Sequence, residues 1–259
     1  MAYFKYKNKS CYYETFGTGE PLIFLHGNTA SSRMFSSLVE SFSQDFEVIL
    51  VDFLGHGKSD RVESFATDLW FDEALQVISL IEQAGYTKVN IIGSSGGALV
   101  AINVALERPD IVNTVIADSF EGEEPFLSFV ENVVAERDAS KQDENAKAFY
   151  YMMHGEDWER VVDNDTKAIF DHSKTIGKFF HKDLSELASP ILLTGSKEDE
   201  FVKLINPNFY NLLFSSMIEK IGHGQMHIFK TGGHPALMSN QDQFSKIAIE
   251  FIKTNLKQI

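Results

Sequence analysis

The sequence VNIIGSSGGALV occupies residues 89–100 and predicts a strand, a sharp turn and a helix in immediate succession. The turn has the pattern G-x-S-x-G, with Ser95 at its apex. A sharp strand-to-helix turn crowds the backbone and needs small residues on both sides. It also exposes the serine hydroxyl and directs the free N–H groups of the helix toward a reacting group. We therefore predict that Ser95 is a nucleophile.

Strand-like and helix-like segments alternate on both sides of this turn. Continuous apolar runs predict buried strands at 22–25 and 48–51. Further strands are predicted at 88–92, 112–117, 191–194 and 226–229. Helices are predicted at 34–42, 66–84, 96–107, 208–220 and 241–255. Two alternating segments, 3–7 and 11–16, predict a hairpin before the first buried strand. This order predicts an α/β fold with a doubly wound, mainly parallel sheet.

The alternation fails between residues 119 and 188. This stretch is acidic, helical in pattern and rich in large apolar side chains, namely Phe126, Phe129, Phe149, Tyr150, Tyr151, Met152, Met153, Trp158, Phe170, Phe179 and Phe180. An insertion between two strands of such a sheet leaves it at the carboxyl ends, where ligands bind. We expect a single domain over 1–259, with a core of 1–118 and 189–259 and a helical cap at 119–188. For any single aromatic residue, packing of the cap onto the core is the favoured interpretation.

Charge and composition indicate which partners this protein would bind and in which compartment it would be found. The net charge of −14 argues against nucleic acid and against an anionic membrane surface, since both carry negative charge. The only cysteine is Cys11, which excludes an internal disulfide and is typical of a reducing compartment. The start, residues 1–7, has no apolar segment of signal-peptide length, and no later run is long enough to span a bilayer. These features predict a cytoplasmic protein.

Four short stretches together resemble the α/β-hydrolase superfamily. They are Leu-His-Gly-Asn at 25–28, Asp-Phe-Leu-Gly-His-Gly-Lys-Ser-Asp at 52–60, the turn at Ser95, and Gly-Gly-His at 232–234. Each is weak alone, but they follow predicted strands in the order that is typical of the family. The resemblance covers nearly all of the chain apart from the cap. One departure is Ser94, because the residue before the nucleophile is often histidine, and this change alters the polarity beside Ser95.

The resemblance implies a Ser…Asp/Glu…His triad, which this sequence supplies as Ser95, Asp199 and His234. A serine hydroxyl needs an adjacent base, and the base needs a carboxylate that fixes its tautomer. Negative charge on a tetrahedral intermediate needs N–H donors that are already in place. The backbone N–H groups of Asn28 and Gly96 are the candidate donors of this oxyanion hole.

Two aspartates compete for the role of the acid in the triad. Asp199 lies in the loop after the strand at 191–194, between Glu198 and Glu200, which are interpreted as solvated. Asp118 ends the strand at 112–117 and is the rival, because some members of the family carry their acid there. The sequence favours Asp199 and leaves Asp118 open.

The other histidines and acidic motifs predict no metal or cofactor site. His26 and His56 are interpreted as ordering their loops by hydrogen bonds, and His154, His172 and His181 as packed or solvated parts of the cap. His223 and His227 have metal-ligand spacing only on a helix, which the neighbouring glycines and strand disfavour. The sequence Asp-Asn-Asp at 163–165 resembles the start of a calcium loop, but the residues after it do not complete one. The glycine-rich stretches do not fit a dinucleotide fingerprint.

Two classes of function remain open. The first is a serine hydrolase that cleaves a carboxylic ester, or a thioester or amide, of an apolar small molecule through an acyl-enzyme. The second is a non-hydrolytic member of the same fold, such as a lyase, an acyltransferase or a small-ligand sensor. The intact triad and oxyanion positions favour the first. The natural substrate, the preferred acyl chain and the oligomeric state are left open by the sequence.

Overall fold

The computed structural model describes residues 2–203 and 205–257, in which eight strands form one sheet. The strands are β1 (Ala2–Tyr6), β2 (Lys9–Phe16), β3 (Glu20–Leu25), β4 (Phe46–Val51), β5 (Val89–Ser94), β6 (Val112–Asp118), β7 (Ile191–Ser196) and β8 (Gln225–Phe229). Their spatial order is β1-β2-β4-β3-β5-β6-β7-β8. The first two strands pair antiparallel, and all pairings from β4 to β8 are parallel. The predicted hairpin and mainly parallel sheet are confirmed.

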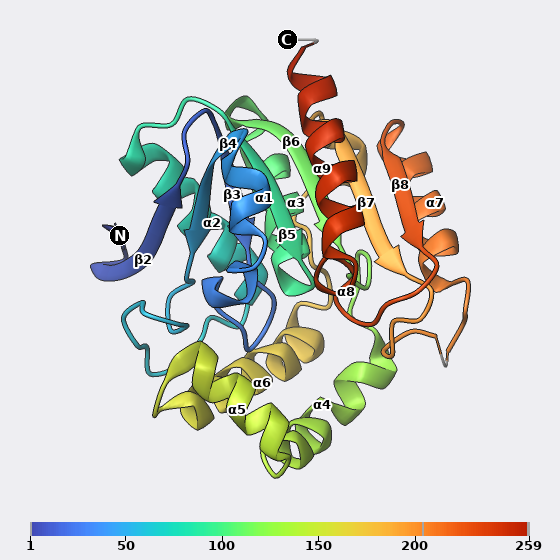
Figure 1. Ribbon diagram of the computed structural model, residues 1–259. Helices are drawn as coiled ribbons and strands as arrows, with labels where there is room; N and C mark the ends of the chain where they lie inside the picture. Colours follow the sequence, from blue (N-terminus) through green and yellow to red (C-terminus); the bar gives the residue numbers. More distant parts are fainter. Residues whose placement is uncertain (1, 204, 258–259) are drawn as a thin grey trace.

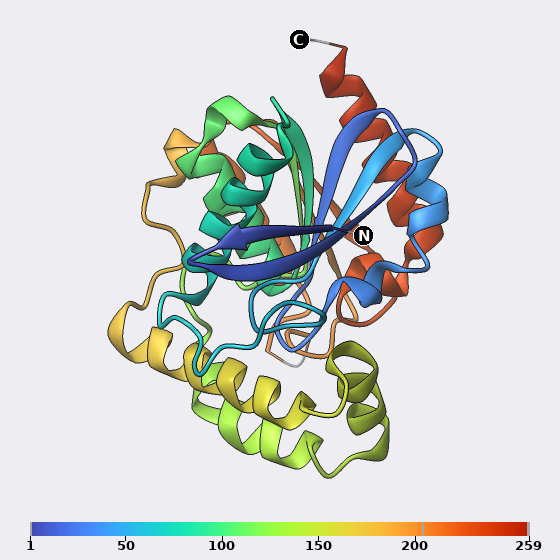
Figure 2. The same cartoon turned by 90° about the vertical axis from the view of Figure 1, so that its left-hand side faces the viewer.

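Helices cover both faces of the sheet (Figures 1 and 2). One apolar cluster joins the sheet to α2 (Leu69–Ala84), α3 (Gly96–Glu107) and α7 (Phe209–Ile221). A second cluster on the opposite face includes α1 (Val39–Ser43), α8 (Ala236–Ser239) and α9 (Gln241–Leu256). The central strands β5, β6 and β7 are buried along their whole length, as expected for parallel strands that have helices on both faces.

The helix predicted at 34–42 is wrong in form. The structure has a 3₁₀ turn at Ser32–Phe35, a short link, and then α1. Serines occupy positions 36 and 37 in that link, and serine favours caps and turns over helix interiors. Phe35, Leu38 and Phe42 are nevertheless all buried, so the apolar spacing that suggested one helix is satisfied by two short pieces.

Three helices leave the sheet between β6 and β7 and lie beyond the carboxyl ends of the parallel strands (Figure 1). They are α4 (Leu127–Ser140), α5 (Glu144–His154) and α6 (Trp158–Thr175). We call this group the cap. Several of its aromatic side chains pack within it or against the core, as the stacking of Tyr150 on Trp158 illustrates. None of the helices within residues 2–203 and 205–257 combines the length and the apolar character that a membrane crossing needs.

Candidate active site

Ser95 lies at the sharp turn between β5 and α3, with backbone angles of φ 55° and ψ −121°. This positive φ is uncommon for a residue with a side chain, and its strain is typical of functional turns. The turn is fixed to the neighbouring strand by a hydrogen bond of 2.8 Å from the Ser95 N–H to the Asp118 carbonyl. The serine side chain is half-buried and remains in contact with solvent.

The glycines around Ser95 are required by close backbone contacts. A Cβ atom on Gly93 would overlap the carbonyl oxygen of Gly97, and one on Gly97 would overlap the carbonyl oxygen of Leu25. These neighbours are backbone atoms, so they cannot move aside without shifting β3 or α3. The small residues that the sequence pattern demands are therefore explained by the approach of the two elements to the turn.

Ser95, His234 and Asp199 form a continuous hydrogen-bonded chain. The Ser95 Oγ atom lies 3.1 Å from His234 Nε2, and His234 Nδ1 lies 2.8 Å from Asp199 Oδ2. A carboxylate only accepts hydrogen bonds, so Nδ1 carries the proton and Nε2 is free to accept from the serine hydroxyl. His234 follows β8 and Asp199 follows β7, so three loops at the same edge of the sheet bring these residues together.

Asp199 is fully buried and has further hydrogen-bond donors. The Tyr210 hydroxyl donates to Oδ2 at 2.7 Å, and the Phe201 N–H donates to Oδ1 at 3.0 Å. Burial by itself would raise the pKa of Asp199, but His234 and Tyr210 outweigh it and hold the pKa below its usual value. The carboxylate is thus kept ionised beside the imidazole.

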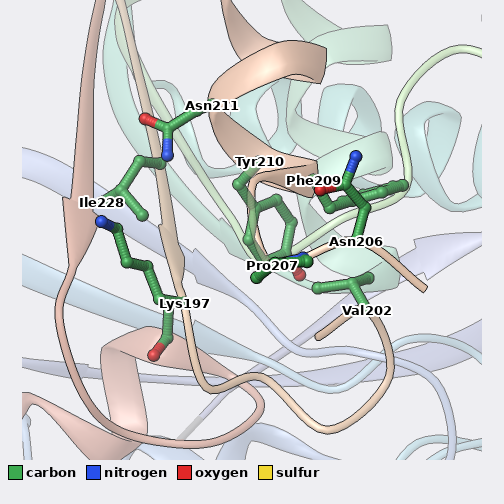
Figure 3. Close-up of a pocket in the computed structure, with 9 residues that line it drawn as sticks. Lys197, Val202, Asn206, Pro207, Phe209, Tyr210, Asn211 and Ile228 are labelled. Carbon is green, nitrogen blue, oxygen red and sulfur yellow. The ribbon is translucent and has the colours of Figure 1, made fainter. Parts of the chain in front are cut away.

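The residues that follow Asp199 pack closely around Tyr210. Figure 3 shows Val202, Asn206 and Pro207 gathered with Tyr210 around a crevice that is too narrow to admit a water molecule. Tyr210 lies in the first turn of α7 and packs on Phe214, so the hydroxyl that bonds Asp199 comes from a fixed ring. This packing fixes the Tyr210 hydroxyl and, through its hydrogen bond, the carboxylate of Asp199.

The rival carboxylates have other partners. Asp118 accepts from the Thr194 hydroxyl at 2.6 Å and from the Leu237 N–H at 3.0 Å. Glu200 accepts from the backbone N–H of His234, not from its ring, and Glu198 is exposed. Burial raises the pKa of Asp118 to about 6, despite its hydrogen bonds. The geometry therefore favours Asp199 as the partner of the imidazole.

The two candidate oxyanion donors, Asn28 and Gly96, belong to segments that meet at Ser95. Gly96 opens α3, and the loop after β3 approaches so closely that a Cβ atom on Gly27 would lie 3.0 Å from the Ser95 Cβ. Among the described residues, neither the Asn28 nor the Gly96 backbone N–H donates to another group of the fold. Both are therefore available to a ligand at Ser95.

Three buried histidines lie behind this loop, where the core meets the cap. His26 accepts from the Phe53 N–H through Nε2 at 3.2 Å, in agreement with its interpretation as a loop-ordering residue. His56 differs, because neither of its ring nitrogens has a hydrogen-bond partner within the described part of the chain. Its ring instead stacks on Phe65 and lies close to the rings of His26 and His154. His154, on α5, bonds the Thr29 carbonyl at 3.0 Å.

These histidines predict that the fold loses stability in acid. Burial lowers the pKa of both His26 and His154 to about 3, whereas an unfolded chain protonates histidine near pH 6.5. Between these values the unfolded chain binds more protons, so the free energy of unfolding falls as pH falls. Each histidine is expected to remove about 2 kcal/mol between pH 6.5 and pH 5. Urea unfolding at several pH values measures this slope.

The variant His154→Gln, which stays neutral at every pH, should reduce that slope by about 1.4 kcal/mol per pH unit. His223→Gln, at an exposed position, controls for the removal of an imidazole. Equal slopes for His154→Gln and the wild type would show that His154 is not held neutral in the fold.

One buried acid, Asp165, was not recognised from the sequence as part of the site. It lies on α6 and is fully buried against the loop that carries Asn28 and Thr29. The sequence pattern of Asp163–Asp165 suggested only an incomplete calcium loop. A signal was present, because Asp165 shares the buried face of α6 with Val161, Val162, Ala168 and Ile169. An acid on an apolar helix face requires a partner.

Comparison with known proteins agrees with this architecture. A sequence profile of the alpha/beta hydrolase fold matches residues 20–148. A thermophilic esterase from Thermogutta terrifontis superposes with a TM-score of 0.76 at 18% identity, over 98% of both chains. The chain belongs to the α/β-hydrolase superfamily. The predicted fold class is thereby confirmed.

Two curated relatives within this superfamily show how far the similarity extends. The (E)-2-((N-methylformamido)methylene)succinate hydrolase of Acinetobacter baylyi is 32% identical over 40% of this chain and 39% of its own length. The 2-hydroxy-6-oxo-6-phenylhexa-2,4-dienoate hydrolase of Comamonas testosteroni is 24% identical over 93% of this chain and 91% of its own. The first curated relatives with 30% identity or more are thus matched over less than half of their length.

Proposed function

We propose that this protein is a serine hydrolase that cleaves a carboxylic ester, or a thioester or amide, of an apolar small molecule. The observation that carries the proposal is the hydrogen-bonded chain from Asp199 through His234 to Ser95, with distances of 2.8 and 3.1 Å. The hydrolase names of the two curated relatives support hydrolysis as the reaction. The unpaired, buried thiol of Cys11 supports a reducing compartment such as the cytoplasm.

In the proposed reaction, Ser95 Oγ attacks the substrate carbonyl carbon while its proton passes to His234 Nε2. The carbonyl oxygen becomes negatively charged and accepts hydrogen bonds from the N–H groups of Asn28 and Gly96. His234 then gives its proton to the leaving oxygen, sulfur or nitrogen, and an acyl group remains on Ser95. Water, deprotonated by the same histidine, releases the acid and restores the serine.

The surroundings of His234 support an apolar substrate. The Phe201 ring meets the imidazole edge-on, with 4.8 Å between ring centroids, and is 51% exposed. The ring of Phe129, on α4, packs edge-on against Phe201. An exposed aromatic surface beside the base would bury the apolar part of a substrate and gain free energy from its removal from water.

The proposal is tested with p-nitrophenyl esters of short and medium acyl chains and with a fluorophosphonate probe. We expect turnover of the esters and covalent labelling of Ser95, which peptide mass spectrometry would locate. Turnover should increase from acetyl to longer acyl groups if the aromatic surface binds the acyl chain. A wild-type protein that neither hydrolyses the esters nor takes up the probe would instead favour a ligand-binding member of the fold. Acyl transfer to an added alcohol in place of hydrolysis would favour an acyltransferase.

A further inference from the structure

The loop that carries Asn28 is held by a carboxylate of the cap. Asp165 Oδ2 accepts one hydrogen bond from the Asn28 side-chain amide at 3.0 Å and a second from the Thr29 backbone N–H at 3.1 Å. Thr29 has a positive φ of 55° and is buried, so the chain bends sharply at this point. A single oxygen atom from α6 therefore fixes two successive residues of the core.

The Asn28 side chain connects this contact to the second candidate donor. Its Oδ1 atom accepts from the Trp70 indole N–H at 3.3 Å and occupies the space that a Cβ atom on Gly96 would need. The amide is thus wedged between α6, α2 and the start of α3. A shift of Asn28 would alter the position of its own backbone N–H relative to Gly96.

Each of the three cap helices contributes a side chain that forms a hydrogen bond with Thr29, and the one from α6 is Asp165. Arg137 of α4 donates to the Thr29 hydroxyl at 2.7 Å, and His154 of α5 donates to the Thr29 carbonyl at 3.0 Å. Arg137 also lies 4.0 Å from Asp165 Oδ1, and His56 lies 3.7 Å from its Oδ2. Burial alone would raise the pKa of Asp165, but these neighbours hold it below its usual value.

We propose that Asp165 is a positioning residue that sets the oxyanion hole, so that the hole is complete only when the cap is docked. This inference rests on the proposed function. An oxyanion donor acts only if it lies about 2.7–3.1 Å from the oxygen that develops charge, and a misplaced donor weakens the transition state more than the bound substrate. The expected signature is a loss in kcat with little change in KM.

The test compares Asp165→Ala with Asp163→Ala in the full chain, with p-nitrophenyl butyrate as substrate. Alanine removes the oxygen that accepts from Asn28 and Thr29, whereas an asparagine oxygen could still accept both bonds. Asp163 lies on the same helix, is exposed and pairs with Lys141, so its variant removes an equal charge without touching the Asn28 loop. We expect Asp165→Ala to lower kcat by about 10- to 100-fold, a loss no larger than that of a missing oxyanion donor, with KM within about 2-fold of wild type. Asp163→Ala should match the wild type. Equal kcat values for the two variants would overturn the proposal.

A second variant keeps the proposal testable if Asp165→Ala does not fold. Asn28→Ala keeps the backbone N–H but removes the side chain that Asp165 holds, so it should also lower kcat at nearly constant KM. The double variant should lose little more than either single variant, because both changes release the same loop. Additive losses, or an unchanged kcat in Asn28→Ala, would contradict the proposal. Wild-type turnover and labelling of Ser95 test the proposed function separately, so the two failures are distinguishable.

Discussion

Replacing Ser95 by alanine is expected to lower kcat for p-nitrophenyl butyrate by about 10⁴-fold or more and to abolish labelling by a fluorophosphonate. The reason is that the Ser95 hydroxyl lies 3.1 Å from His234 Nε2 and is the group that this base would deprotonate for attack on a substrate. Removing it leaves the oxyanion donors and the aromatic surface, which bind substrate but form no acyl-enzyme. The fold should be unaffected, because the strained backbone of the turn is set by its neighbours and not by the hydroxyl.

Ser94→Ala is the matched control. Ser94 is fully buried at the end of β5, and its hydroxyl has no hydrogen-bond partner among the residues that the structure describes. The variant should therefore retain wild-type kcat and a melting temperature at or slightly above that of the wild type, since an unpaired buried hydroxyl opposes folding. Substantial activity in Ser95→Ala, or labelling at Ser94, would remove Ser95 from the role of nucleophile.

Much of the fold follows from local patterns in the sequence. The runs at 22–25 and 48–51 are apolar without interruption, which is typical of a strand that is buried on both faces. Gly85, in the left-handed conformation, ends α2 where the sequence predicted it. The segment 34–42 was mispredicted, because spacing alone does not distinguish one helix from two short pieces that bury the same side chains. The short helix α8 carries no such periodic signal in its four residues.

Some residues of the candidate site can likewise be predicted from local sequence, and others depend on the folded structure. Ser95 and His234 are marked by nearby glycines, which lie on both sides of the serine and directly before the histidine. The choice between Asp118 and Asp199 depends on where two adjacent strands end relative to a histidine, and this is a property of the folded sheet. The role of Asp165 depends on contacts with residues 136 and 137 positions away in the chain. No local pattern in the sequence specifies such a contact.

Asp199→Asn is expected to lower kcat by about 10⁴-fold, as tautomer loss does in other triads. The amide oxygen would still accept from the Phe201 N–H, which leaves the amino group facing His234 Nδ1. That nitrogen would then have to accept, which moves the imidazole proton to Nε2, where it points at Ser95. A protonated Nε2 cannot take the serine proton, so the base is lost although the ring stays in place. Measurements of kcat between pH 6 and pH 9, together with rates of fluorophosphonate labelling at Ser95, quantify this loss.

Asp118→Asn provides the comparison that decides the acid. Asp118 is as buried as Asp199 and lies at the end of the adjacent strand, but its oxygens bond Thr194 and the Leu237 N–H and not the imidazole. Its replacement removes one charge from the same edge of the sheet while His234 Nδ1 keeps its carboxylate. We expect at least a tenth of the wild-type kcat, with unchanged labelling at Ser95. If Asp118→Asn were crippled while Asp199→Asn worked almost normally, the acid would be Asp118, and the bond between His234 and Asp199 would be structural.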